Sequence, residues 1–244
     1  MSEKSEEEIS NKMKEIAEKI KEKGEKLAEE IREWYEVLAE DLGIELNVEK
    51  ESRKEESFWL AVVLSSRWII GGMDWKKGGE GDEYIKQVFQ LTRDPSKRSD
   101  EDLRNAVFMK GFRGSRKNVV YNMLKFYAKE LDNYNASNIL ANPVVYQKKI
   151  IKDAEETSGV GHWMATVPFK VLAFAGLLPN NVINDLEPPI GSSVRRGIKI
   201  IFGIDIDEMK KNDREIVTEL HRHLAKLAGT NIFIINSGLW SIGL

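Results

Sequence analysis

The chain of 244 residues contains no cysteine and only three histidines. Disulfides and thiolate metal sites are therefore excluded, and metal chemistry has few ligands to draw on. The longest apolar stretches, residues 58–64 and 232–235, fall far short of the roughly 18 residues that a membrane span requires. No charged segment followed by an apolar one opens the chain as a signal sequence would. We expect a cytoplasmic protein without a membrane partner, a metal or a cofactor.

Sustained alternation of apolar and polar residues is also missing, which argues against strands. Residues 58–70 are apolar nearly all round and predict a buried helix, whereas residues 49–57 before it are interpreted as a charged linker. Ser99 followed by three acidic residues predicts a capped helix start, and Asn142-Pro143 predicts another. The expected fold class is all-α, with about ten helices.

The N-terminal segment predicts a long acidic amphipathic helix. Apolar residues recur there at alternating spacings of four and three, with Lys23 in one slot: Ile9, Met13, Ile16, Ile20, Leu27, Ile31, Trp34 and Leu38. Such a helix can pair with a partner helix through residues 6–40 or lie along the body of its own chain. We favour the second interpretation, because only about four heptads are present. Gly43 is the predicted end of the helix.

Acidic and basic residues are distributed unevenly. Residues 1–57 hold 19 acidic and 11 basic residues, whereas the rest of the chain holds 21 acidic and 26 basic residues. Residues 103–129 contain no acidic residue and seven basic ones: Arg104, Lys110, Arg113, Arg116, Lys117, Lys125 and Lys129. Such a surplus on a helix is typical of a surface that neutralises phosphates. A solvated helix face is the alternative.

A Gly-Val-Gly turn between two predicted helices is the most informative motif. Gly159-Val160-Gly161 lets the backbone pass close to a phosphate, and the helix that follows presents its N-terminus to the anion. A helix C-cap without a ligand would use the same tripeptide. His162 beside the turn is a further candidate donor to a phosphate or a base.

The sequence from Gly159 through His162, Trp163 and Ala165 resembles the hairpin signature of the helix-hairpin-helix DNA glycosylases. In that family, the second residue after the final glycine is lysine in lyase-type members and tryptophan in the bacterial 3-methyladenine glycosylases. Trp163 therefore resembles the monofunctional group. The resemblance implies double-stranded DNA as the partner.

Residues 58–244 also resemble the archaeal 8-oxoguanine glycosylases. The resemblance implies a two-lobed fold with a base pocket between the lobes and a hairpin near residues 157–177, preceded by the acidic helix and linker of residues 1–57. It also implies that Phe169 and Trp240 line the base pocket, with Asn236 where the family has an acidic residue. Trp68 and Trp75, on either side of Gly71-Gly72, are further candidates for a pocket wall beside Trp163.

The departures from the family pattern concern catalysis. Two alignments with the family pattern are possible, one on the Gly-Val-Gly turn and one on Phe169. The first places Trp163 at the position of the lyase lysine and the second places Ala165 there, so neither supplies the amine. The family's catalytic aspartate corresponds to Gly191, which has no carboxylate to stabilise positive charge on the sugar. Asp185 and Glu187, a few residues earlier, are candidate substitutes.

Three further basic residues are candidates for DNA binding. Lys170 lies two turns after Trp163 on the same helix face, and we expect it to bind phosphate or to stay solvated. Arg195 and Arg196 open the helix after Gly191, where they position DNA or form surface ion pairs.

Two functions remain open from the sequence. The first is an N-glycosylase of base excision repair that flips a damaged purine, either 8-oxoguanine or an alkylated base, out of the duplex and hydrolyses its glycosidic bond. The second is a non-catalytic protein that recognises DNA or a modified base on a degenerate glycosylase fold. A helical interaction protein that recruits a partner through its Glu/Lys-rich helix ranks below both.

Overall fold

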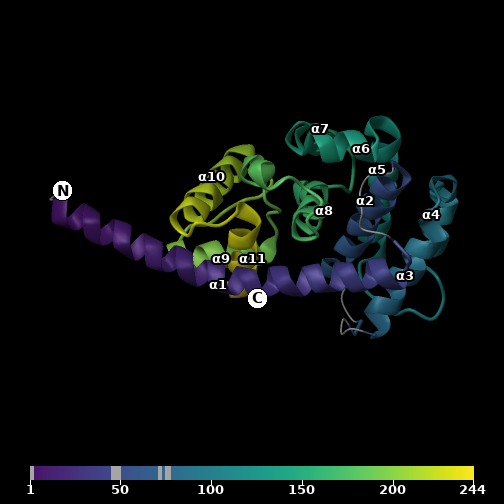
Figure 1. Cartoon of the computed structure of the whole chain (residues 1–244), viewed down its shortest axis with the longest axis horizontal. Coiled ribbons are helices and arrows are strands. Elements are labelled where there is room, and N and C mark those ends of the chain that lie inside the picture. The colour runs from purple at the N-terminus through teal and green to yellow at the C-terminus, as the bar shows by residue number, and fades with distance from the viewer. Residues whose placement is uncertain (1–2, 45–50, 71–72, 75–77) are drawn as a thin grey trace. The chain divides into compact units, whose positions relative to one another are not determined.

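The computed structural model describes the chain apart from residues 1–2, 45–50, 71–72 and 75–77 (Figure 1). The fold is all-α, and the described residues contain no strand. The α-helices are α1 (Glu3–Asp41), α2 (Glu51–Ser65), α3 (Glu80–Thr92), α4 (Asp100–Val107), α5 (Lys117–Tyr134), α6 (Ala136–Ala141), α7 (Pro143–Glu156), α8 (His162–Phe174), α9 (Ser192–Phe202), α10 (Lys211–Leu227) and α11 (Ile232–Ile242). Three short 3-10 helices join them: η1 (Ser66–Trp68), η2 (Pro95–Lys97) and η3 (Asn180–Asp185). Within the described residues, no helix combines the length and the apolar character that crossing a membrane requires.

The chain divides into two compact units. The first unit comprises Met1–Ile31 and Pro179–Leu244, and the second comprises Arg32–Leu178. The helix α1 contributes residues to both units.

The first unit depends on the close approach of α11 to α1 and α9. A Cβ added to Gly238 of α11 would overlap the carbonyl oxygen of Ile20, and one added to Gly24 of α1 would overlap the carbonyl oxygen of Ile234. A Cβ on Gly197 of α9 would likewise overlap the carbonyl oxygen of Leu239. Glycine at these positions lets helix backbones touch, so the apolar α11 is buried between the two helices.

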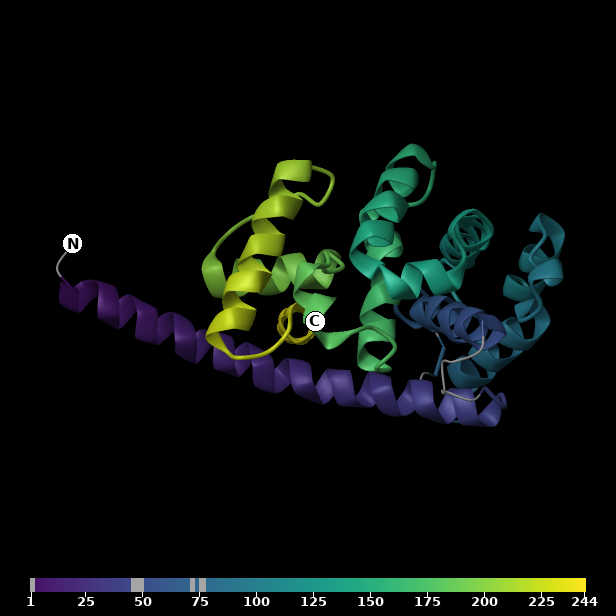
Figure 2. The ribbon, with the colours of Figure 1, turned by 45° about the horizontal axis from the view of Figure 1, so that its top comes forward.

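The second unit has its core around α2 and α8. Residues 57–66 of α2 and η1 are all buried, and α8 packs on both α2 and α7 (Figure 2). Phe169 of α8 meets Phe58 of α2 edge to face with ring centroids 6.3 Å apart. Tyr127 of α5 joins the same core and donates a hydrogen bond of 2.8 Å to the carbonyl oxygen of Ala165. This packing fixes the position of α8, and therefore of the loop that precedes it.

Several sequence predictions are confirmed. The long N-terminal helix ends where Gly43 adopts a φ of 65°, and its apolar residues from Ile20 to Leu38 are buried in the chain itself, apart from the partly exposed Leu27. The Ser99 side chain accepts a hydrogen bond from the Asp102 amide at the start of α4, and α7 begins at Pro143. Gly71-Gly72 and Trp75 lie outside the described residues.

One prediction about local structure is wrong. Residues 51–57 are not a linker, since they form the first half of α2, where Glu55 and Glu56 are paired with Arg98 and Arg93. These partners come from a distant part of the chain, which local pattern does not show. The apolar residues from 232 onward form the helix α11, capped by the Asn231 side chain.

Gly238→Ala tests the helix crossing in the first unit. Alanine favours a helix by about 1 kcal/mol over glycine, but here its methyl group would overlap the Ile20 backbone. We expect a net loss of about 3 kcal/mol in the free energy of unfolding, measured by urea denaturation. Ser241→Ala in the same helix is the matched control and should change stability by less than about 0.5 kcal/mol. Equal stability of the two variants would contradict the crossing.

Candidate nucleic-acid interface

The loop between α7 and α8 forms a tight turn. The Val160 amide donates to the carbonyl oxygen of Thr157 at 3.2 Å, and Gly159 has a φ of 80°, in the left-handed region that glycine favours. The Val160 side chain is buried, whereas Ser158, Gly159 and Gly161 are exposed. The turn therefore anchors itself by one apolar side chain and presents its backbone to solvent.

The two glycines of the turn have different surroundings. A Cβ at Gly159 would lie 2.7 Å from Nδ2 of Asn122, so α5 covers this side of the turn. Gly161 is the N-cap of α8 with an ordinary extended backbone, and a Cβ there would meet no atom within 4 Å. The first amides of α8 have no acceptor within the helix, and its first turn carries no acidic residue. An anion can thus approach Gly161 closely.

Some basic residues between 103 and 129 interact with other groups of the protein, whereas others are exposed to solvent. Lys117 donates to the carbonyl oxygen of Phe112 at 2.8 Å and lies over the ring of Tyr84, and partial burial lowers its pKa. Lys125 forms an ion pair with Asp100. Lys129 is exposed and lies on the same face of α5 as Asn122, seven residues on. The positive charge next to the turn is therefore smaller than the sequence suggests.

Arg113 and Arg116 precede α5 and are both exposed. Arg116 adopts a left-handed φ of 62° as the residue before the helix, and the Arg113 amide donates to the carboxylate of Glu80 at 3.0 Å. Both guanidinium groups lie on the surface of the second unit, where a phosphate can reach them.

Lys170 is not a surface residue, so the expectation that it stays solvated or binds phosphate is wrong. It is 5% exposed within α8, and its Nζ lies 5.9 Å from the ring centre of Phe174. Burial lowers the pKa of Lys170 to about 7, because the charged form is poorly solvated there. A substantial fraction of this amine is thus neutral at physiological pH.

The aromatic residues predicted to line a base pocket have different environments. Phe169 is fully buried in the core of the second unit against Phe58, so its ring offers no open face to a base. Trp163 and Trp68 are half-buried in the same unit. Trp240 is half-buried in the first unit, on α11.

Asn236 of α11 contacts two other segments of the first unit. Its Nδ2 donates to the carbonyl oxygen of Pro189 at 2.9 Å and lies 3.3 Å from Nε2 of His221, whose Nδ1 lies 2.7 Å from the Val217 carbonyl oxygen. Both neighbours of Nδ2 act as acceptors when the imidazole is protonated on Nδ1. A side-chain amide donates hydrogen bonds to both acceptors, whereas a carboxylate has no hydrogen to donate. This difference explains asparagine at position 236. The Pro188-Pro189 segment and the C-terminal helix are thereby brought together.

Gly191, which the resemblance in sequence pairs with a catalytic aspartate, lies in the first unit. Gly191 is the N-cap of α9 and has no side-chain group to offer. Asp185 is exposed at the end of η3, which Arg222 anchors through the carbonyl oxygens of Asn184 and Asp185, and Glu187 is half-buried. Arg195 forms an ion pair with Glu208, as one of its two predicted roles required, whereas Arg196 is exposed and donates to the carbonyl oxygen of Leu244 at 3.3 Å.

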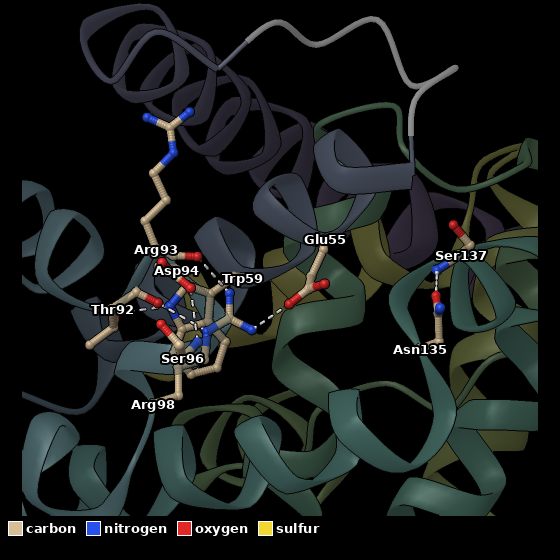
Figure 3. Close-up of polar contacts among 9 residues, drawn as sticks. All are labelled: Glu55, Trp59, Thr92, Arg93, Asp94, Ser96, Arg98, Asn135 and Ser137. Atoms are coloured by element: carbon tan, nitrogen blue, oxygen red, sulfur yellow. Dashed lines mark hydrogen bonds and ion pairs between the residues drawn. The ribbon is translucent and has the colours of Figure 1, made fainter.

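The second unit has a groove of about 450 Å³, whose lining includes the arginines drawn in Figure 3. Arg98 is held there over the ring of Trp59 and donates to Glu55 at 2.7 Å, while Arg93 forms a bidentate pair with Glu56. Both arginines are thus neutralised by α2, and the groove is a structural junction between α2, α3 and η2.

Sequence patterns missed two polar residues of α5. Asn122 covers Gly159, and Glu130 is fully buried in α5. Neither belongs to a recognisable motif, and only the packing of α5 on its neighbours reveals them.

Comparison with known proteins adds no relative: no family model matches the chain, and searches of curated proteins and of solved structures return no significant match.

Lys170→Met tests the buried amine. The unfolded chain keeps the lysine proton up to about pH 10.4, whereas the folded chain loses it above about 7. The free energy of unfolding should therefore rise with pH between these values, by at most about 1.4 kcal/mol per unit. In Lys170→Met this contribution should vanish, and stability at pH 7 should increase.

Urea unfolding at several pH values measures both effects, with the exposed Lys148→Met as control. An identical pH profile in Lys170→Met and wild type would contradict the burial.

Proposed function

We propose that this chain binds double-stranded DNA through the turn at residues 157–161 and acts as an N-glycosylase of the base-excision-repair type on a damaged purine. The observation that carries the proposal is the turn itself. A Cβ at Gly161, the N-cap of α8, would meet no atom within 4 Å, and Asn122 of α5 lies against Gly159 of the same turn. Backbone amides at a helix N-terminus bind phosphate without reading sequence, as a protein that scans DNA requires.

Glycosidic bond cleavage would follow extrusion of the target base from the duplex. Trp163, next to the turn, and Trp240 are both half-buried and offer partly accessible rings for stacking, whereas Phe169 does not. Asp185 and Glu187 are the carboxylates available in the chain segment before Gly191. We assign them the stabilisation of positive charge on the sugar, a role that the substitution at position 191 leaves unfilled.

Recognition of DNA without cleavage is the second candidate function, and the geometry at Gly191 favours it. The residue contributes only backbone groups, and Asp185 is exposed to solvent. An exposed carboxylate stabilises a developing cation less than a buried one, because water screens its charge.

Gly161→Val tests the turn as the DNA-binding element. The Cβ of the new side chain would meet no atom within 4 Å, so we expect the free energy of unfolding to change by less than about 1 kcal/mol. The same side chain would obstruct a phosphate, and we expect the affinity for a duplex to fall at least about tenfold. Fluorescence anisotropy with labelled duplex DNA measures the affinity, and urea denaturation checks the fold.

Ala141→Val is the matched control for Gly161→Val, because it adds apolar bulk at an exposed position of α6 in the same unit. Its affinity should equal that of the wild type. Equal affinity of Gly161→Val and wild type would exclude backbone contacts at the turn.

Single-turnover cleavage tests the chemistry. The protein is incubated with end-labelled duplexes that contain 8-oxoguanine, an alkylated purine, hypoxanthine or uracil, and abasic sites are then broken with hot alkali. We expect strand breaks that depend on a damaged purine and that Asp185→Asn or Glu187→Gln reduces at least about tenfold. Tight binding to the lesion without strand breaks would replace this function by the second candidate.

A further inference from the structure

Glu130 is a buried acid that no function assigned above uses. Its side chain is fully buried in α5, and no hydrogen-bond donor of the described residues reaches either carboxylate oxygen. An ionised carboxylate in such surroundings is strongly destabilising, because neither water nor a donor solvates its charge.

The neighbour of Glu130 is another acid, Asp153 of α7. The hydroxyl of Tyr134 donates a hydrogen bond of 2.6 Å to Oδ2 of Asp153. Burial, the charge of Asp153 and a hydrogen bond to Asp153 together raise the pKa of Glu130 to about 7, and Lys129 opposes them. A hydrogen bond between two carboxyl groups requires a proton on one of them, because an ionised carboxylate only accepts.

The charged and titratable groups near this pair come from a few elements. α5 itself contributes Tyr127, Lys129 and Tyr134, while α7 contributes Tyr146 and Lys149, whose Nζ lies 4.7 Å from the ring centre of Tyr146. α6 carries no charged residue, and the titratable residues of α8 are His162 and Lys170. The acids of α2 nearest its middle, Glu55 and Glu56, are paired with Arg98 and Arg93.

We propose that Glu130 and Asp153 share one proton at neutral pH, and that its loss to solvent is a pH-sensitive switch that loosens α5 from α7. In the protonated state, the Glu130 carboxyl donates its hydrogen to the Asp153 carboxylate and joins the two helices. After deprotonation two like charges face each other inside the unit, and the helices separate or take up water.

The switch acts on both elements that carry the turn at residues 157–161. α7 leads directly into the turn, where the Thr157 hydroxyl donates to the carbonyl oxygen of Asp153 at 2.7 Å. α5 supplies Asn122, which covers Gly159. Loss of the shared proton therefore releases the turn from both sides. The switch itself is independent of the proposed DNA binding, and only its effect on affinity rests on that function.

Urea unfolding of the full chain between pH 5 and pH 8 tests the switch, with Glu130→Gln as the variant. Glutamine donates to Asp153 at every pH and cannot be deprotonated. A carboxyl whose folded pKa exceeds its unfolded value stabilises the fold at low pH and loses this contribution as pH rises through the folded value. The folding equilibrium constant of the wild type relative to Glu130→Gln should thus fall on the order of 100-fold between pH 5 and pH 8.

Glu156→Gln, an exposed acid on α7, is the matched control and should keep the pH profile of the wild type. If Glu130→Gln does not fold, Asp153→Asn removes the charge of Asp153 and supplies a hydrogen-bond donor. This variant should reduce the pH dependence of stability without abolishing it, because Glu130 stays buried. A constant ratio of wild type to Glu130→Gln across this range would overturn the proposal. So would a wild-type protein that millimolar Mg²⁺ or Ca²⁺ stabilises selectively at pH 8, since the pair would then hold a cation. DNA affinity measured over the same range reports separately on the turn.

Discussion

The burial of α8 against α2 and α7 is the constraint on which the candidate interface depends. From Ala165 to Leu172 every residue of this helix is buried, and its core contact is the edge-to-face pair of Phe169 and Phe58. A helix fixed on all sides cannot adjust its first turn, so the loop before it is held as well. Gly159 and Gly161 then expose their backbone beside the end of a rigid helix. The positions of these backbone groups are therefore fixed before any ligand binds.

The same burial creates unusual electrostatics within the second unit. Lys170 is desolvated inside α8, and Glu130 is desolvated inside α5 beside Asp153. The pKa of the amine falls and that of the acid rises, both to about 7, so the unit contains two groups that change charge near neutral pH. Lys117 and Lys125 of α5 already interact with other groups of the protein. The positive electrostatic potential at the surface of α5 is therefore modest. The proposed binding of DNA therefore depends more on backbone amides that position a phosphate than on long-range electrostatic attraction.

Helices, caps and the turn could be predicted from the sequence because their signals are local. The apolar periodicity of residues 6–40, the cap at Ser99 and the glycine at 159 each act within one or two turns of chain. The helical start of α2 could not be predicted, since Glu55 and Glu56 are held by arginines about 40 residues away. Neither could the burial of Lys170 nor the pairing of Glu130 with Asp153, which depend on which faces of α5, α7 and α8 meet.

Amide chemical shifts of the labelled protein, recorded by NMR while unlabelled duplex DNA is added, test the central claim most directly. Binding at the turn predicts that the backbone amides of residues 158–163 and the side-chain amide of Asn122 shift first, and that added salt reverses the shifts. Unchanged resonances at these positions, with shifts confined to other surfaces or absent altogether, would contradict the account.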